Sequence, residues 1–457
     1  MKHHLLACFV LTAAAAFLPI SAVSAATLTE RVLANAKALE TKAIAWRHDI
    51  HQHPELGNQE HRTAALIAAH LRQLGMVVET DVGTTGVVAL LKGGKPGPVV
   101  GLRADMDALP VREQTGLPFA SEASQKYHGE LMPVMHACGH DAHVAILMAV
   151  AENLAAHRED IPGSVKFIFQ PAEEGPSDYV YDGERHFGAR LMVEQGVLNS
   201  PPVAAIFGLH VTSAAPTGVI GYRSGPLMAA SGDLHIRVQG KQTHGAQPWN
   251  GVDPIVASAQ IINGLQTVVS RQTNLMPAPA VVTIGTIKGG NRHNIIPDSV
   301  VMTGTIRTFG DDVQHRLNQQ VKRTVEHTAL ASQAEAQVTI VDNYATTVND
   351  SELTARMLST LQRASGDRAV LSPLVTASED FSYFSQQVPG LFFFLGVTPA
   401  DKMGRAAPNH SPEFLVDDKA LITGVRALSA LTTDYLAHAQ QTQAQDTSAG
   451  STENTGD

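Results

Sequence analysis

Residues 144–170 read VAILMAVAENLAAHREDIPGSVKFIFQ, in which an alanine-rich helical pattern is followed by a short apolar strand at 164–170. The same alternation is found on both sides of this segment. Strands are predicted at 86–92 and 99–104 before the helix, and another strand at 203–209 after it. Helices that alternate with short apolar strands are typical of an α/β domain with a mixed, mostly parallel sheet flanked by helices.

A different pattern begins after Gly225. Residues 233–239 alternate apolar and polar side chains, as in a sheet with one solvated face. The order is strand 233–239, helix 254–272, strands 281–288 and 300–308, helix 313–330 and strand 337–342. This β-α-β-β-α-β order is the signature of a ferredoxin-like α+β unit. Residues 226–342 are therefore predicted to form a second domain that is inserted into the first.

The α/β pattern returns after the insertion, with a helix at 352–364, a strand at 390–396 and a helix at 415–437. We therefore expect the first domain to consist of residues 27–225 and 343–439. Residues 440–457 are mostly Gln, Thr, Ser, Gly and acidic residues without an apolar period. This composition predicts a disordered tail.

The composition excludes several classes of protein. With 457 residues, the chain is longer than one hydrophobic core usually allows, so two domains are expected. Hydrophobic residues make up 44% and charged residues 17%, which excludes a wholly disordered chain. The net charge of −10 argues against a nucleic-acid partner, because such proteins present a basic surface to the phosphates. The 21 histidines invite a search for metal ligands.

The first 26 residues have the pattern of a secretory signal peptide. A short start with Lys2 is followed by an apolar run at 5–20 and by small residues at 21–26 that suit cleavage. An uncleaved membrane anchor would need about 20 apolar residues. A lipoprotein signal would place Cys8 before most of the apolar run. Cleavage predicts an exported protein, periplasmic or secreted, without a stable membrane anchor and with Cys138 as its single cysteine.

Four short clusters of ligand-type residues lie at the ends of predicted strands or in the loops that follow. They read HACGHDAH at 136–143, QPAEEG at 170–175, GLH at 208–210 and NHSPEF at 409–414. In α/β sheets, ligands collect outside the carboxyl ends of the strands. Thiolate, imidazole and carboxylate groups suit zinc, manganese and cobalt. Together, the clusters fit a two-metal hydrolase.

Each cluster alone also has an explanation without a metal. Cys138 and His140 could be a buried thiol beside a solvent-facing histidine, and Glu173 and Glu174 could form a solvated acidic turn. Adjacent carboxylates repel, so such a pair at a strand end is costly unless a cation or a proton is shared. One of the two could then ligate a metal while its neighbour acts as a general base.

The order and the residues of these clusters resemble the motifs of the di-metal amidohydrolases of the aminoacylase/carboxypeptidase superfamily. The most similar branch contains hippurate hydrolase, N-acyl-amino-acid amidohydrolases and plant auxin-conjugate hydrolases. The resemblance runs from about Arg47 to Leu431. It includes HPEL at 53–56, LRADMDALP at 102–110, THG at 243–245, NIIPD at 294–298 and SEDF at 378–381. It implies a zinc-peptidase-like catalytic domain with an inserted ferredoxin-like domain that serves as lid and dimer interface.

The resemblance implies a site for two divalent metal ions per subunit, which are manganese, zinc or cobalt. The positions that match the ligands of the branch are Cys138, His140, Glu174, His210 and His410. Glu173 matches the general base, which takes a proton from the water between the metals and later returns it to the leaving amine. Ligation would also protect the thiol of Cys138, since an exported protein meets oxidants.

Five further positions have expected roles, and for four of them the role is implied by the resemblance. His244 matches a histidine of the lid that stabilises the tetrahedral oxyanion, in this superfamily often from the partner subunit. Asn294 and Arg307 lie where relatives bind the carboxylate of the substrate, a group that a planar guanidinium suits. Asp107 is expected to orient a metal ligand rather than to bind the metal, and Asp141, at the start of the helix after His140, either caps that helix or orients a ligand histidine.

The sequence therefore predicts an exported, metal-dependent amidohydrolase, a homodimer that cleaves the amide bond of N-acyl amino acids or similar small conjugates. The alternative is a dipeptidase or carboxypeptidase with the same di-metal chemistry, which activity on free dipeptides would identify. A catalytically silent binding protein is disfavoured, because no residue of the expected catalytic set is missing. Glu379 has either a packing or a catalytic role, and the segment 176–187 either borders the pocket or is a solvated loop.

Overall fold

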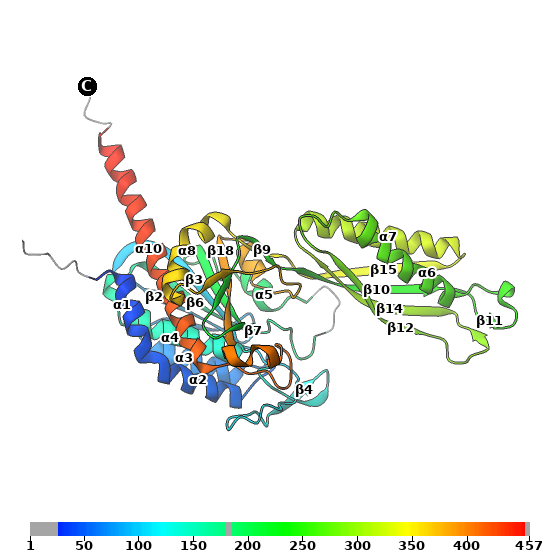
Figure 1. Ribbon diagram of the computed structural model, residues 1–457, viewed down its shortest axis with the longest axis horizontal. Helices are drawn as coiled ribbons and strands as arrows, with labels where there is room; N and C mark the ends of the chain where they lie inside the picture. The colour runs from blue at the N-terminus through cyan, green and yellow to red at the C-terminus, as the bar shows by residue number, and fades with distance from the viewer. Residues whose placement is uncertain (1–25, 180–184, 453–457) are drawn as a thin grey trace, which may run out of the picture.

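The computed structural model describes residues 26–179 and 185–452, with side chains up to residue 441. The predicted signal peptide, apart from Ala26, lies outside the described residues. The described part forms a larger and a smaller lobe, which Figure 1 shows next to each other along the long axis.

The larger lobe is built on an eight-stranded mixed sheet. Its strands lie in the order β1 (Val77–Val82), β2 (Gly86–Lys92), β6 (Pro162–Gln170), β3 (Lys95–Asp105), β7 (Val203–Pro216), β18 (Gly390–Thr398), β8 (Ile220–Tyr222) and β17 (Ala369–Leu371). The central strands β6, β3, β7 and β18 are parallel neighbours, whereas β1 and β2 pair antiparallel. The carboxyl ends of the four central strands therefore point to the same side, where ligands bind in such sheets.

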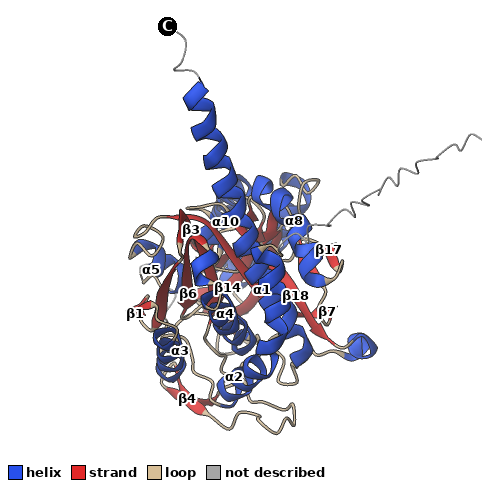
Figure 2. Ribbon diagram, turned by 90° about the vertical axis from the view of Figure 1, so that its left-hand side faces the viewer, coloured by secondary structure: helices blue, strands red, loops and turns tan. Residues whose placement is uncertain are grey.

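Helices cover both faces of this sheet, and Figure 2 looks onto the side formed by α1, α2, α3, α4 and α10. The helices of this face are α1 (Leu28–Asn35), α2 (Glu40–Gln52), α3 (His61–Gln73), α4 (His140–Ala155), α8 (Ser351–Ser365) and α10 (Leu421–Thr452). The opposite face carries α5 (Gly188–Glu194) and α9 (Ser382–Ser385). Val87 of β2 packs in the first core and Val88 in the second, as the alternation of a strand requires. Burial of both faces explains the nearly continuous apolar sequence of these strands.

The smaller lobe, residues 230–344, contains a four-stranded antiparallel sheet and two helices with a core of their own. The sheet order is β12 (Val281–Gly289), β14 (Ser299–Thr308), β10 (Ala230–Gln239) and β15 (Glu335–Tyr344). The helices α6 (Pro254–Thr267) and α7 (Asp311–Ala331) pack on this sheet. The chain order β10-α6-β12-β14-α7-β15 is ferredoxin-like. The predicted fold class is confirmed, and the predicted domain limits stay a prediction.

Two chain segments connect the lobes. β9 (Gly225–Met228) leads into β10, and β16 (Thr347–Asn349) follows β15. β9 and β16 pair antiparallel, with Thr347 opposite Met228, so the outgoing and returning segments lie side by side. A rotation of the smaller lobe relative to the larger one would have to take place about this pair of strands.

The ends of two elements differ from the sequence prediction. β7 continues to Pro216 instead of ending near residue 209, because β18 pairs with it along most of this length. α10 continues to Thr452, whereas a tail without regular structure was predicted from residue 440. Gln and Ala have good helix propensity, so a run of them can extend a helix that the core has nucleated.

A hairpin of β4 (Ser124–Tyr127) and β5 (Glu130–Pro133) was not predicted, since these short strands are mostly exposed and have no apolar alternation. Among the residues that the structure describes, no helix is long and apolar enough to span a membrane.

Candidate metal centre

The predicted metal ligands gather beyond the carboxyl ends of the central strands. Cys138 and His140 lie at the N-terminus of α4, Glu174 in the loop after β6, and His410 in the loop between β18 and α10. His210 lies inside β7 rather than after its end, which differs from the prediction. The fold thus brings together all five residues from four separate parts of the chain.

Gly139 explains the spacing of the first two ligands. Its φ of 92° lies in the left-handed region, and a Cβ atom there would approach the side chain of Val211 to 2.4 Å. Glycine adopts this conformation without strain. The turn before α4 can therefore direct both Cys138 and His140 to the same side.

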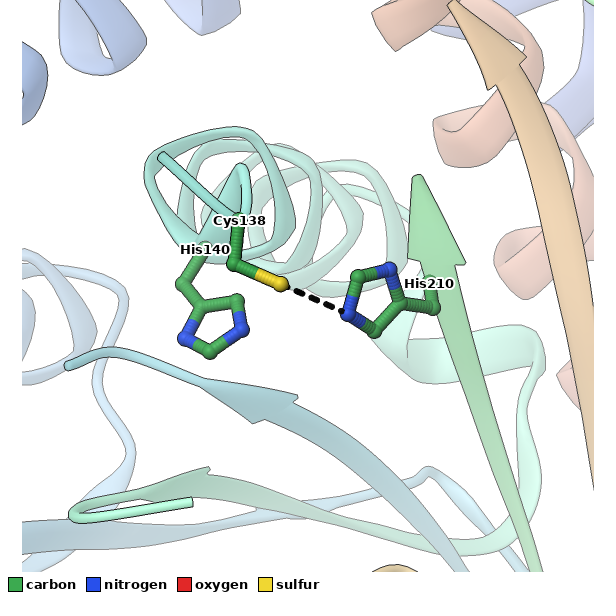
Figure 3. A group of neighbouring side chains, drawn as sticks. All are labelled: Cys138, His140 and His210. Atoms are coloured by element: carbon green, nitrogen blue, oxygen red, sulfur yellow. Dashed lines mark hydrogen bonds between the residues drawn. The ribbon is translucent and has the colours of Figure 1, made fainter. Parts of the chain in front are cut away.

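Cys138 belongs to two groups of neighbouring ligand atoms. Its sulfur lies 3.4 Å from Nε2 of His210 and 3.2 Å from Nε2 of His410. Figure 3 shows the thiol pointing toward the ring of His210, with the ring of His140 beside it. The groups are Cys138–His140–His210 and Cys138–Glu174–His410, and within each group the ligand atoms lie within 4.8 Å of one another. Because they share one sulfur, the two groups could hold two ions close together.

Hydrogen bonds orient the two inner histidines. Nδ1 of His210 donates to the carbonyl of Val211 at 2.7 Å, and Nδ1 of His140 donates to Asp107 at 3.2 Å. Both rings therefore direct the lone pair of Nε2 into the site. Nε2 of His140 is buried and has no hydrogen-bond partner among the described residues. It lies 3.7 Å from an oxygen of Asp105, so this nitrogen is available to a cation in the site.

The electrostatics of the site favour a cation. Burial, together with the charges of Glu174 and Glu173, raises the pKa of the Cys138 thiol well above its usual value. Burial lowers the pKa of His210 to about 4.

Burial disfavours the charged form of Glu174, but the hydrogen bond and charge of His410, together with the charge of His140, outweigh burial and lower the pKa of Glu174. Despite burial, the charge of Asp105 raises the pKa of His140 to about 10, and the hydrogen bond to Glu174 raises the pKa of His410, which favours their protonated forms. A divalent ion would displace these protons and compensate the thiolate and carboxylate, so the donor types present fit the predicted metals.

Glu173 is the buried carboxyl group beside these ligands. It is 5% exposed, and burial together with the charges of Glu379 and Glu174 raises its pKa well above the usual value. One of its oxygens accepts a hydrogen bond from the backbone N–H of Asp380 at 3.4 Å. A raised pKa makes a carboxylate a stronger proton acceptor, as a general base requires.

The loop that carries Glu173 and Glu174 is held by two carboxylates of the larger lobe. The N–H of Ala172, whose φ is 50°, donates to the buried Glu60 at 2.8 Å. The N–H of Glu174 donates to Asp107 at 2.9 Å. The sequence analysis did not find Glu60, because it lies 112 residues before Ala172 and outside every ligand cluster.

Asn409, next to the ligand His410, was also missed. Its amide nitrogen donates to the carbonyls of Cys138 and Val211, both at 3.1 Å, and its oxygen accepts from the N–H of Ser213 at 3.2 Å. One side chain therefore fastens the loop of His410 to the start of α4 and to β7. The NHSP motif was the signal for it, but only His410 was considered.

The two aspartates predicted to support the ligands have different surroundings. Asp107 contacts His140 and the backbone of Glu174 directly, as described above. Asp141 is completely buried and accepts hydrogen bonds from Arg47 at 3.0 Å and from His51 at 2.9 Å. Despite burial, the charge of Arg47 holds the pKa of Asp141 far below its usual value. Asp141 therefore anchors the start of α4, one residue after His140.

A completely buried arginine balances the remaining carboxylates. Arg103 donates to Asp105 at 2.8 Å, to Glu379 at 2.9 Å and to Asp380 at 3.0 Å. Asp105 also pairs with Nδ1 of His143, whose Nε2 accepts the N–H of Val211 at 2.8 Å. The sequence assigned no definite role to Glu379 and His143. These contacts place both residues in the hydrogen-bond network behind the metal ligands.

The residues predicted on the smaller lobe are not brought to this group. His244 is exposed in β11 (Thr243–His244), which pairs with β13 (Ile295–Ile296) next to Asn294. Figure 1 shows β11 at the end of the smaller lobe remote from the larger lobe. Arg307 lies at the other end of the lobe, opposite Ser231, and donates to the carbonyl of Ile306 at 3.0 Å. In this structure His244, Asn294 and Arg307 therefore do not form one site with the predicted ligands.

The site opens into a cavity of about 190 Å³. Polar walls come from Glu173 and the ligands other than His140, and apolar walls from Met228, Val375 and Phe394. Of the segment 176–187, Tyr179 and residues 185–187 instead line a separate cavity of about 290 Å³ against β15. Phe187 of this segment contacts the ring of Tyr179, with centroids 4.7 Å apart, and residues 180–184 lie outside the described residues.

The known proteins that are similar to this chain include a carboxypeptidase, a deacetylase and a dinuclear metal-binding peptidase. Thermostable carboxypeptidase 1 of Saccharolobus solfataricus is 40% identical over 410 residues, 89% of this chain and 99% of that protein. N-acetyl-L-cysteine deacetylase of Bacillus subtilis is 37% identical, covering 85% of this chain and 86% of that protein. A Bacillus subtilis crystal structure, described as a dinuclear metal-binding peptidase of the M20 family, has a TM-score of 0.72 at 34% identity and covers 88% and 99% of the two chains.

Residues 101–434 match the model of Peptidase family M20/M25/M40. This match covers most of the chain and includes the four clusters from which the resemblance was inferred, so the resemblance is confirmed. The chain belongs to Peptidase family M20/M25/M40 and is a metal-dependent amide hydrolase.

Proposed function

We propose that this protein hydrolyses the amide bond of N-acyl amino acids or similar small conjugates, with Glu173 as the general base. The observation that carries the proposal is the buried carboxyl group of Glu173 on one cavity with the buried thiol of Cys138, the half-buried Glu174 and His210, and the exposed His410. Cys138, His140, Glu174, His210 and His410 would hold two divalent ions, which are manganese, zinc or cobalt.

In this proposal, bound divalent ions supply Lewis-acid chemistry, which polarises an amide carbonyl and lowers the pKa of water. Glu173 takes the proton of the attacking water, for which its raised pKa is suited. The same carboxyl group then gives the proton to the leaving nitrogen. His244 stabilises the oxyanion, either from the partner subunit or after the lobes have closed. Asn294 and Arg307 are proposed to bind the carboxylate of the substrate.

The cavity supports a small, partly apolar substrate. Its volume of about 190 Å³ and the side chains of Met228, Val375 and Phe394 suit a compact acyl group. The deacetylase from Bacillus subtilis is named for the removal of such a group from an amino acid. A second candidate is a carboxypeptidase with the same di-metal chemistry, which is favoured by the 40% identity to the archaeal carboxypeptidase.

A substrate panel separates the two candidates. The chelated protein is incubated with manganese, zinc or cobalt and then with N-acetyl and N-benzoyl amino acids, free dipeptides and N-blocked dipeptides. Metal-restored cleavage of the N-acyl amino acids, several-fold faster than of the peptides, is the expected result. Activity confined to peptides would replace the proposal with the carboxypeptidase or dipeptidase.

Export and dimer formation are further parts of the proposal. The apolar run at 5–20 and the small residues at 21–26 support cleavage and transport to the periplasm or the medium. N-terminal sequencing of protein from each cell fraction tests this, and an intact Met1 in the cytoplasm would contradict it. Light scattering on the mature protein is expected to give twice the mass of the chain.

A further inference from the structure

A tyrosine at the border of the smaller lobe is hydrogen-bonded to the backbone of the proposed base. Tyr344 is the last residue of β15 and lies opposite Ser231, where both strands leave the smaller sheet. Its phenol hydroxyl donates a hydrogen bond to the carbonyl oxygen of Glu173 in the larger lobe. The two residues are 171 positions apart, so this contact is created by the way the lobes are joined.

The hydrogen bond acts on a peptide unit that both lobes hold. The carbonyl of Glu173 and the N–H of Glu174 belong to the same planar peptide. Tyr344 binds its oxygen, and Asp107 binds its N–H at 2.9 Å. A rotation of this plane would change the directions of the side chains on both sides of it. One of these is the proposed base and the other a proposed metal ligand.

Tyr344 also lies at the place where the lobes are connected. The preceding residue, Asn343, accepts a hydrogen bond from the hydroxyl of Tyr383 on α9 at 2.6 Å. Three residues after Tyr344, the hydroxyl of Thr347 in β16 donates to the carbonyl of Glu379 at 3.0 Å. These two contacts fasten the returning segment to the larger lobe, but neither acceptor belongs to the peptide of Glu173.

We propose that Tyr344 is a positioning residue for amide hydrolysis, which couples the placement of the smaller lobe to the orientation of the Glu173–Glu174 peptide. The inference rests on the proposed role of Glu173. A hydrogen bond weakens steeply when its length or angle departs from the optimum. A rotation of the smaller lobe that carries the tyrosine away therefore releases the carbonyl, and the base is aligned only in lobe orientations that keep this contact.

The test compares two substitutions that each remove one hydroxyl. Tyr344→Phe keeps the ring and its contact with Phe187, whose centroid lies 6.5 Å away, so the variant is expected to fold. Tyr383→Phe is the matched control, because its hydroxyl binds the same segment without touching the peptide of Glu173. Each metal-loaded variant is assayed on the substrate that the wild type cleaves fastest, and its metal content and Tm are measured.

For Tyr344→Phe we expect kcat to fall about tenfold, which corresponds to about 1.4 kcal/mol. KM is expected to stay within about twofold, and metal content and Tm to be unchanged, since only the alignment of the base is lost. Tyr383→Phe is expected to keep kcat within about twofold. A wild-type kcat for Tyr344→Phe, or an equal loss in both variants, would overturn the inference.

Glu173→Gln separates this inference from the proposed function. If Glu173→Gln abolishes turnover while Tyr344→Phe keeps the wild-type kcat, the base is correct and the role of Tyr344 is wrong. If Glu173→Gln retains turnover, the proposed base is wrong, and the inference that rests on it is wrong as well.

Discussion

The two lobes hold their predicted functional residues in opposite ways. In the larger lobe, His140 and Glu174 are both held by Asp107, and Asn409 fastens the loop of His410 to its neighbours. In the smaller lobe, His244 is exposed, and the hydrogen bond recorded for its ring is an N–H from Ala246, two residues away. The first group is fixed before any ligand arrives, and the second still has to be brought to its place.

The difference follows from where each group lies on its sheet. Four of the ligands lie in loops or at a helix start near the carboxyl ends of neighbouring parallel strands, and His210 lies within one of these strands, so the fold places all five on one side of the sheet. β10 runs from Ala230 at the lobe connection to Gln239, nine residues later, or roughly 30 Å along a strand, and His244 follows this far end. A metal centre can therefore be complete in one lobe, whereas an oxyanion contact from the other requires closure or a second subunit.

Replacing the base should have the largest effect on turnover. We expect Glu173→Gln to lower kcat by about 10³-fold or more, because general acid–base catalysis contributes about 10²–10⁴-fold. Metal content is expected to remain at the wild-type level. Glu174→Gln, the same change one residue later, is expected to lose metal as well as activity. Equal metal loss in both variants, measured by atomic absorption, would contradict the division of labour between them.

The histidine of the smaller lobe should have the next largest effect. We expect His244→Ala to lower kcat by about 10²-fold, the size of effect found when an oxyanion donor is removed. Its exposure predicts an unchanged Tm and unchanged metal content. If the residue comes from the partner subunit, mixing His244→Ala with Glu173→Gln subunits should restore part of the activity. Absence of any restoration would favour closure within one chain.

The sequence predicted the parts of the molecule in which local pattern and function coincide. Apolar strands buried on both faces, such as β6, are recognisable from composition, and Cys138 and His140 follow from the motif around Gly139. Glu60 and Tyr344 could not be predicted, because their contacts depend on how distant segments pack and their local sequence carries no ligand pattern. The positions of His244 and Arg307 relative to the ligands depend on the connection between the lobes, for which the sequence has no local signal.

The buried contacts of Asp141 with Arg47 and His51, at the start of α4, predict a pH dependence of stability. Although burial opposes it, the charge of Asp141 raises the pKa of His51 to about 9. A raised pKa contributes stability that is fully present below the unfolded value of about 6.5 and is lost as pH rises toward 9. We expect the unfolding free energy of the chelated protein to fall by up to about 3 kcal/mol over this range.

Urea unfolding at pH 6 and pH 9 checks this expectation. In His51→Gln the fall should be smaller than in the wild type, because the variant has lost the His51 stabilisation already at pH 6. The remaining fall comes from other groups with raised pKa values, such as His140. A variant with the same fall as the wild type would show that His51 is not the group responsible, and that the network around Asp141 is less charged than the structure indicates.

The smallest effect concerns how tightly the metal is held. Asp107 accepts hydrogen bonds from His140 at 3.2 Å and from the N–H of Glu174 at 2.9 Å, so one carboxylate orients two ligands. The two bonds are accepted by different oxygens of Asp107, and in Asp107→Asn one of these becomes an NH₂ group, so only one of the two bonds can be kept. We expect the metal affinity to fall by about 10–100-fold, the usual cost of losing such a partner. With excess metal, kcat should return to near the wild-type value.

The control is Glu113→Gln, which changes a buried carboxylate that binds His51 and none of the proposed metal ligands. This variant should keep the metal affinity of the wild type. An unchanged affinity in Asp107→Asn would mean that the ligands keep their orientation without this carboxylate, and the larger lobe would then be less fixed than its hydrogen bonds indicate.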